Sequence, residues 1–412
     1  MKKAYCKTAL TKFFNDFKDF VSLHRKILIL YVILCVILIP ISWQQDVYDW
    51  YFVVGKLVSE GKNVYEPLNV QAIIKRGDTG RWGYPSFFLP LFSFSYVVSA
   101  VINLPFHVVC KSLVAFVNVL VAMELEKIAK SSRVVALYLF NPLILVSTIM
   151  QGFFDVLVIF FILLALKSLN KTSSAAYMGL SSLCKQTAWP LIPFFVVLNL
   201  NIKWFFFFLS LVVAGLLPFL MLNFQAVMEA VVIQHQARIG ISPWSTIVKF
   251  ASISGPLIQW LNICVATTQL VLIVLLAVTV RGKLKSSNSL DKTKIFEYFL
   301  LYELVSLTFV YLVVPPVPHF LSYLLVPTIL LMATHPEFKY PYIFLSITGY
   351  VVFTMDQGLR HTVFHYNVWA GPIYLGYYHL ELLVWIVGAC LSLIMYTSFF
   401  FTFYKVWRRD TQ

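Results

Sequence analysis

The sequence predicts an all-α membrane protein, a polytopic bundle of about 11–13 transmembrane helices. Hydrophobic residues make up 60% of the 412 positions and charged residues only 12%, about half the share of a soluble domain. The mean hydropathy is +0.81. The apolar runs are continuous and do not alternate with period two, which argues against a β-barrel. Helices satisfy their own backbone polar groups in lipid, so the runs are expected to be helical.

Apolar runs of about 20 residues, the length that crosses a bilayer, follow one another along the chain. We expect a basic N-terminal segment at 1–26, followed by the first span at 27–44, and a short C-terminal tail at 405–412. The later spans are expected at 107–128, 133–150, 153–169, 174–199, 204–222, 256–280, 296–314, 320–334, 341–354 and 376–404.

The segment 174–199 is apolar but contains Lys185, Pro190 and Pro193. Proline removes a hydrogen bond from a helix interior, so we expect two short half-helices that meet near the outer face. Counting both halves gives twelve crossings and places the two termini inside.

The segment 86–104 is also apolar enough to cross. A crossing here would move the basic connections 127–133 and 167–171 to the outer side, against the tendency of Lys and Arg to remain in the cytoplasm. We therefore expect a re-entrant or interfacial helix.

The formal net charge is +14. We attribute it to the bias of Lys and Arg toward the cytoplasmic side of a membrane protein, so no nucleic-acid partner is expected. Seven Lys and Arg residues precede the first span, and others gather at 281–294 and 405–409. The positive-inside bias places these groups in the cytoplasm, near the anionic headgroups of membrane lipids. The chain from 27 to 404 is expected to form a single transmembrane domain. Its outer-face loops are 45–85, 223–254 and 355–375.

The first outer loop carries two carboxylates, Asp46 and Asp49, just beyond the first span. At positions i and i+3 of a helix they would share one face. Such acids can take a proton from an acceptor hydroxyl or hold a metal ion against phosphate oxygens. The alternative is that they cap the amphipathic helix that runs to Ser59, since Asp is a favourable N-cap.

Asp155 and Lys185 are charged residues at or within apolar segments. Asp155 either caps the span that it opens or faces the interior of the bundle, because a carboxylate is costly against lipid. Lys185 can bind a phosphate group as a point charge or extend to the headgroups. The neighbouring Gln186 and the proline kink favour a pocket.

Two further cations lie in predicted outer loops. Arg238 could form a forked contact with a phosphate or belong to a solvated loop. His319 follows three prolines that fix its backbone, and it could shuttle a proton or bind phosphate. The alternative for His319 is an interfacial side chain bonded to the backbone.

No metal site is indicated by the cysteines, because the six are scattered and none forms a Cys-x-x-Cys pair. The loop with Asp356, His361 and His365 matches a metal site only weakly. We therefore expect no cofactor, and a divalent metal is possible through Asp49 but not implied.

Several motifs together resemble a known family. In chain order they are Glu60-Gly-Lys-Asn-Val-Tyr65, Trp82-Gly-Tyr-Pro85, Asn141-Pro142, Gly152-Phe-Phe-Asp155 and Lys185-Gln186. Over 27–330 the chain resembles the multispan GT-C glycosyltransferases, which use polyprenyl-phosphate sugars. Within that class it looks like the family 87 mannosyltransferases of phosphatidylinositol mannoside synthesis and the first mannosyltransferase of GPI-anchor synthesis.

The first-loop motif is the most specific part of the resemblance. In the family an Asp precedes the Tyr of a Gly-x-x-Pro-Tyr turn, and Asp46, 19 residues before Tyr65, fits that place better than Asp49. Val64 stands where the family has Pro, and Phe153 where it often has Gln. These departures leave the subfamily, and hence the sugar, open.

The resemblance implies that the protein transfers a hexose, mannose being favoured, from a polyprenyl-phosphate donor to a lipid-linked or glycan acceptor on the outer face. Asp46 would be the base, with Asp49 beside it. The donor phosphate would be bound by Lys185, Arg238 and His319. The supporting residues would be Asp155, Gln186, Tyr65 and Tyr84.

Two other functions fit parts of the sequence. A transporter or flippase of a lipid-linked sugar would want broken helices near the middle of the membrane and a repeated half, and no repeat is visible. A non-catalytic subunit would tolerate Asp46→Asn. For location, the plasma membrane of a prokaryote is preferred, with the endoplasmic reticulum as the alternative.

Overall fold

The computed structural model describes residues 2–42, 50–66, 82–169, 171–199, 202–233, 256–286, 292–313, 321–360 and 381–409. Every element within these ranges is a helix, as the sequence predicts. The first half contains α1 (Lys2–Leu23), α2 (Arg25–Ile41), α3 (Phe52–Ser59), α5 (Phe88–Ile102), α6 (Phe106–Ala129), α7 (Arg133–Leu139), α8 (Pro142–Ile144), η2 (Leu145–Met150), α9 (Asp155–Lys167) and α10 (Thr172–Cys184). The second half contains η3 (Gln186–Leu191), α11 (Ile192–Asn199), α12 (Ile202–Leu222), α13 (Phe224–Met228), η4 (Glu229–Ile233), α15 (Pro256–Ser286), α16 (Lys292–Val313), α17 (Ser322–Thr334), η7 (Pro336–Phe338), α18 (Lys339–Arg360) and α19 (Glu381–Arg409).

The helices coincide with the predicted spans, but fewer of them pass a strict test of length and apolarity. Among the described residues, α6, α12 and the Ile386–Arg409 part of α19 are long and apolar enough to cross a membrane. Two bent pairs, α1 with α2 and α7 with the helix that follows it, would raise the number to five. The number of crossings stays a prediction.

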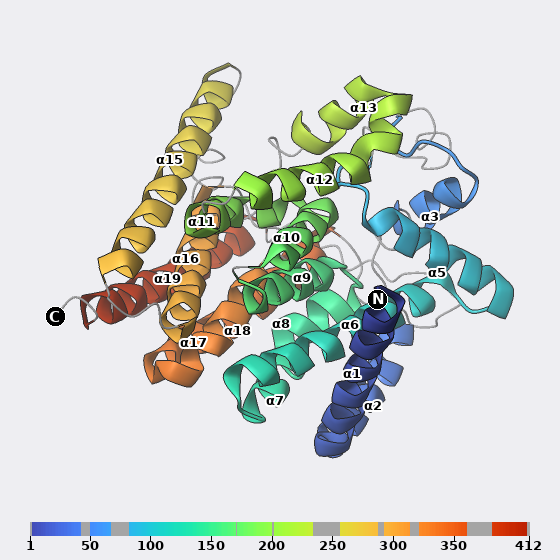
Figure 1. The fold of residues 1–412 in the computed structure, drawn as a ribbon, viewed down its shortest axis with the longest axis horizontal. Helices are drawn as coiled ribbons and strands as arrows, with labels where there is room; N and C mark the ends of the chain where they lie inside the picture. The colour runs from blue at the N-terminus through green and yellow to red at the C-terminus, as the bar shows by residue number, and fades with distance from the viewer. Residues whose placement is uncertain are drawn as a thin grey trace.

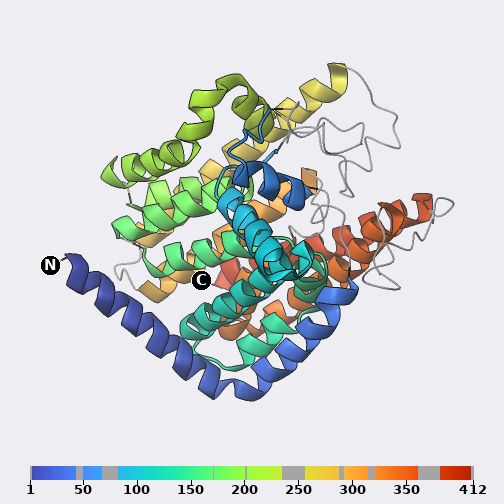
Figure 2. The same cartoon turned by 90° about the vertical axis from the view of Figure 1, so that its right-hand side faces the viewer.

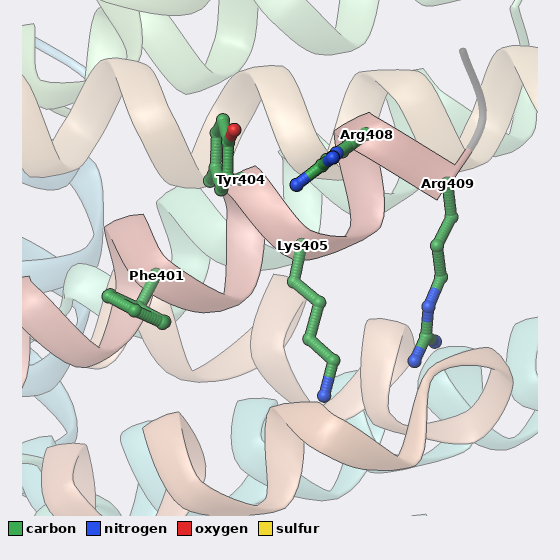
Figure 3. A pocket seen from close by; sticks show the side chains of 5 residues that line it. All are labelled: Phe401, Tyr404, Lys405, Arg408 and Arg409. Atoms are coloured by element: carbon green, nitrogen blue, oxygen red, sulfur yellow. The ribbon is translucent and has the colours of Figure 1, made fainter. Parts of the chain in front are cut away.

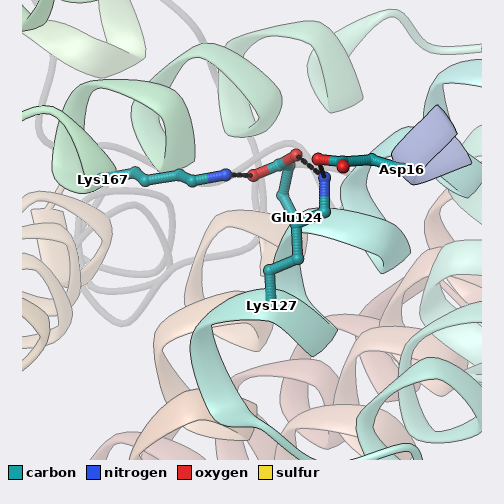
Figure 4. Close-up of polar contacts among 4 residues, drawn as sticks. All are labelled: Asp16, Glu124, Lys127 and Lys167. Atoms are coloured by element: carbon teal, nitrogen blue, oxygen red, sulfur yellow. Dashed lines mark hydrogen bonds and ion pairs between the residues drawn. The ribbon is translucent and has the colours of Figure 1, made fainter. Parts of the chain in front are cut away.

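The bundle has two chemically different ends. At one end α9 begins with Asp155, which contacts Tyr323 in the first turn of α17. We call this the site end. At the other end Lys167, in the last turn of α9, binds Glu124 near the end of α6 (Figure 4). We call this the basic end, since Lys127 and Arg409 also lie there.

The predicted span 133–150 is bent, because the chain breaks at Asn141-Pro142. The parts on either side meet at 43°. The side-chain Oδ1 of Asn141 accepts a hydrogen bond of 2.9 Å from the backbone N–H of Leu143. Pro142 occupies the first helical position, where its missing N–H costs nothing.

The predicted half-helices of 174–199 are present, but they separate at Lys185 and not at the prolines. Lys185 is extended, with φ −161° and ψ 148°. Pro190 lies in the 3₁₀ helix η3, and Pro193 lies in the first turn of α11, where a proline is tolerated. The break therefore leaves Lys185, a lysine within an apolar segment, on non-helical backbone.

Helix α5 has both of its ends near the site end. Phe92 packs on Phe154, next to Asp155, with ring centroids 5.0 Å apart. A short turn after α5 leads to Phe106, whose ring lies 5.5 Å from that of Phe52 in α3. Figure 1 shows α3 and α5 together at one side of the molecule, with α15 at the opposite side. This arrangement favours the interfacial interpretation of 86–104.

Candidate active site

A buried ion pair joins the two charged residues that the sequence places in apolar segments. Nζ of Lys185 lies 2.7 Å from Oδ1 of Asp155. The two residues are only 3% and 2% exposed. Asp155 is the first residue of α9, and Lys185 lies between α10 and η3. Asp155 therefore faces the interior, as one of its two interpretations predicts, and Lys185 does not extend to the headgroups.

Two tyrosines contact this pair. The hydroxyl of Tyr323 donates a hydrogen bond of 2.6 Å to the same Oδ1 of Asp155. The ring of Tyr84 covers the ammonium of Lys185, with Nζ 4.7 Å from the ring centroid. A buried ion pair offsets its desolvation only when further polar contacts satisfy both charges, and a ring face attracts a cation. We call these four residues the Asp155–Lys185 cluster.

The segment predicted to be the first outer loop packs directly against the cluster. The hydroxyl of Tyr65 donates a hydrogen bond of 2.9 Å to the backbone oxygen of Tyr84. Oδ1 of Asn63 accepts one of 3.1 Å from the backbone N–H of Tyr65. Burial raises the pKa of the Tyr65 phenol, so this group remains a neutral donor. The Gly-Lys-Asn turn therefore fixes Tyr65, and Tyr65 in turn holds the backbone of Tyr84, whose ring covers Lys185.

Gln186 connects the segments predicted to be the first and second outer loops. Its Nε2 donates hydrogen bonds to the backbone oxygens of Gly83, at 3.0 Å, and Val231, at 2.8 Å. Both contacts are structural, because they fix backbone that borders the cluster. The predicted supporting residues Asp155, Gln186 and Tyr84 thus gather around Lys185.

Three buried polar atoms close in sequence to the cluster lack hydrogen-bond partners among the described residues. They are Oε1 of Gln151 and the hydroxyl oxygens of Ser182 and Thr187. Gln151 precedes Asp155 by four residues, Ser182 precedes Lys185 by three, and Thr187 follows Lys185 by two. Buried polar groups are normally paired, so a bound polar molecule could satisfy some of these atoms.

A second buried lysine, Lys111, lies at the site end and is not among the predicted site residues. Nζ of Lys111 donates hydrogen bonds to the backbone oxygen of Ser42, at 2.7 Å, and to its hydroxyl, at 3.1 Å. Ser42 directly precedes the segment with the two predicted acids. The signal was a lysine in an apolar span, but nothing in the sequence identified its partner. Tyr323 was missed because buried tyrosines are common in such helices.

Four predicted site residues lie outside the described ranges: Asp46, Asp49, Arg238 and His319. Their roles stay predictions. The described chain resumes after the two acids at Trp50, and the ring of Tyr51 lies 4.3 Å from that of Phe92 and 6.1 Å from that of Phe154. The first loop therefore returns to the start of α9 beside Asp155.

A cavity of about 220 Å³ lies elsewhere, at the C-terminal end of α19. Figure 3 shows its lining, which consists of Phe401, Tyr404, Lys405, Arg408 and Arg409. It belongs to the basic end and is separate from the Asp155–Lys185 cluster. Within the described part of the chain, no three His, Cys, Asp or Glu side chains group as metal ligands would.

The comparison with solved structures identifies a similar fold. The crystal structure of ArnT from Cupriavidus metallidurans, bound to undecaprenyl phosphate, matches with a TM-score of 0.50 at 10% sequence identity. The match covers 93% of this chain and 76% of that one. The fold is therefore that of a GT-C-like membrane bundle. No family model and no curated protein sequence matches the chain.

Proposed function

We propose that this protein is an integral-membrane glycosyltransferase that takes a sugar from a polyprenyl-phosphate donor at the site end of the bundle. The observation that carries the proposal is the convergence of the first outer loop on a buried Asp–Lys pair. That convergence occurs in a fold similar to that of ArnT, a protein solved with undecaprenyl phosphate bound.

Lys185 is the proposed ligand of the donor phosphate. Its ammonium already binds Asp155, which holds the side chain in place. An ammonium has three donors, and in this proposal one of them binds a phosphate oxygen while another keeps the contact with Asp155. Because Lys185 is 3% exposed, the ring of Tyr84 has to move aside when the donor enters. Negative charge develops on the departing phosphate, and a fixed cation stabilises it.

Asp46 is the proposed base, with Asp49 beside it. It accepts the proton of the acceptor hydroxyl as the acceptor oxygen bonds to the anomeric carbon. The bond from that carbon to the phosphate oxygen breaks, and polyprenyl phosphate leaves. A single displacement inverts the anomeric centre. Arg238 and His319 supply further contacts to the phosphate, and the lipid tail lies in the membrane beside the helices.

The finer part of the proposal comes from the first-loop resemblance. We propose that the sugar is a hexose, with mannose favoured, and that the acceptor is a lipid-linked or other glycan on the non-cytoplasmic face. The preferred location is the plasma membrane of a prokaryote, with the endoplasmic reticulum as the alternative. The whole chain from 27 to 404 acts as a single domain in this scheme.

The test is a transfer assay with the purified protein in nanodiscs. Polyprenyl-phosphate mannose and polyprenyl-phosphate glucose are offered with lipid extracts, and mass spectrometry identifies any glycosylated product. Asp46→Asn should abolish transfer while extraction and thermal unfolding stay unchanged. Full turnover by this variant would remove the base assignment. Absence of any product with every donor would count against the activity.

A transporter of a lipid-linked sugar is the second candidate. The observation that favours it is the broken helix at Lys185, since discontinuous helices carry substrate sites in many transporters. A flippase moves the labelled donor across the bilayer of a proteoliposome and leaves it chemically intact. A transferase releases polyprenyl phosphate, so the chemical state of the lipid distinguishes the two.

A further inference from the structure

The N-terminal helix α1 meets α2 at 89°, and Figure 2 shows the sharp turn between the two helices. Helix α2 runs alongside α6 in the opposite direction. His24, which precedes α2, lies 2.7 Å from Glu126, and Ser42, which follows α2, binds Lys111. Because α6 is long enough to cross the membrane, α2 runs along the membrane normal beside it. Helix α1 must then run close to the plane of the membrane.

Two neighbouring residues of α1 fix which side faces the membrane. The ring of Phe17 lies 6.0 Å from that of Phe116 on α6. The carboxylate of Asp16 accepts a hydrogen bond of 2.9 Å from Lys127 (Figure 4). Phe116 and Lys127 lie about three helical turns apart on α6. Phe17 therefore points toward the middle of the span, and Asp16 points toward its charged end.

Several exposed residues of α1 agree with this orientation. Phe14 is 59% exposed and Val21 is 37% exposed. They lie three residues before and four residues after Phe17, so they share its side of the helix. Asn15 and Ser22 are also exposed, and each lies one position further on, about 100° around the helix. Phe14 and Val21 therefore face the membrane interior, and Asn15 and Ser22 face away.

Two other exposed residues of α1 lie outside this division. Lys18 lies beside Phe14 and Val21, and its long stem lets the ammonium reach the headgroups. Leu23, 69% exposed, lies on the opposite side of the helix at the bend into α2.

We propose that α1 is an in-plane membrane helix that inserts Phe14 and Val21 at the boundary between the lipid headgroups and the acyl chains. Amphipathic helices in this position bury their apolar side a few ångströms into the lipid. The partner is the bilayer surface at the basic end. This proposal does not depend on the catalytic activity, and it gives the basic segment 1–26 a structure and a role.

The test uses spin labels at four exposed positions of the full chain in nanodiscs, after Cys6, Cys264 and Cys390 are replaced by serine. The variants are Phe14→Cys and Val21→Cys, with Asn15→Cys and Ser22→Cys as matched neighbours. Collisions with oxygen report lipid, and collisions with a water-soluble nickel chelate report water. We expect the ratio of oxygen to nickel accessibility to be several-fold higher at 14 and 21 than at 15 and 22.

Two outcomes would overturn the proposal. Equal ratios at all four positions would place α1 in water. Dipolar broadening of the labels at 14 and 21, reversed by dilution with unlabelled protein, would instead make this side an interface between two copies of the chain.

Discussion

At the scale of single residues, Lys185 and Asp155 each depend on the other. Removing one partner leaves the other charge buried without compensation, which costs about 3–5 kcal/mol. Replacing both with apolar residues of similar size removes both desolvation penalties. The pair therefore allows the structural and catalytic roles of Lys185 to be separated.

We expect Lys185→Met to lower the free energy of unfolding by about 3–5 kcal/mol and to abolish sugar transfer. The double variant Lys185→Met/Asp155→Leu should recover most of the stability and none of the activity. Thermal unfolding in detergent and the transfer assay measure the two effects. Recovered activity in the stable double variant would show that Lys185 has only a structural role.

Asp155 and Lys185 could be identified as candidates from the sequence, because charges in apolar segments are costly and few, but Tyr323 could not. The pairing of Asp155 with Lys185 could not be predicted either. Asp155 opens α9, Lys185 lies in the break between α10 and η3, and Tyr323 is distant in the chain. Nothing in the local pattern states which helices are neighbours. The Asp155–Lys185 ion pair and the hydrogen bond from Tyr323 depend on how the helices pack. Sequence motifs identify single residues of such a site and not the contacts between them.

At the scale of elements, the first loop depends on the contact between α3 and α5. Gly55 in α3 approaches α5 so closely that an added Cβ would lie 2.5 Å from the backbone oxygen of Phe92. Phe92 in turn packs on Tyr51 and Phe154. A side chain at position 55 must separate the two helices and shift the residues that border Asp155.

We expect Gly55→Ala to lower both thermal stability and transfer activity. A matched control is Gly282→Ala in α15, where an added Cβ meets nothing within 4 Å. Alanine favours a helix over glycine by about 1 kcal/mol, so the control should be unchanged or slightly more stable. Equal melting temperatures for the two variants would contradict the close packing of α3 and α5.

The docking of α1 has a predictable pH dependence. The hydrogen bond from Lys127 lowers the pKa of Asp16 below its ordinary value of 3.8. A lowered folded-state pKa stabilises the docked helix above that ordinary value, and the contribution is lost as the pH falls through the folded pKa. We expect a spin label at Ser22 to keep constant mobility from pH 7 to about 4 and to become more mobile only below.

Asp16→Asn imitates the protonated form and serves as the control. Its label should be more mobile than the wild-type label at pH 7, and the difference should vanish at acid pH. The effect should be small, because the pair is partly exposed and Phe13, Phe17 and Phe20 still hold α1. If the label mobility in the protein with Asp16 intact changed near pH 6, a titrating group other than Asp16 would control the docking of α1.

At the scale of the whole molecule, composition and the length of the apolar runs were enough to predict the fold class and the position of most helices. The bends at Asn141 and Lys185 were harder to predict, because the place where a helix breaks depends on its packing against neighbouring helices. The orientation of the bundle in the membrane is inferred from the sequence and from the structure together. Charge counts predict that the basic connections lie inside, and the structure places Lys167 and Asp155 at opposite ends of α9, about 20 Å apart.

This orientation predicts that the site end and the basic end are accessible from opposite sides of the membrane. Lys62 lies in the first outer loop near the site end, and Lys171 lies at the start of α10 near the basic end; both are exposed. In a background with Cys6, Cys264 and Cys390 replaced by serine, a membrane-impermeant maleimide should label Lys62→Cys in intact cells. It should label Lys171→Cys only after permeabilisation. Reversed labelling would place the Asp155–Lys185 cluster on the cytoplasmic face, where a donor sugar needs no transfer across the bilayer before it reacts.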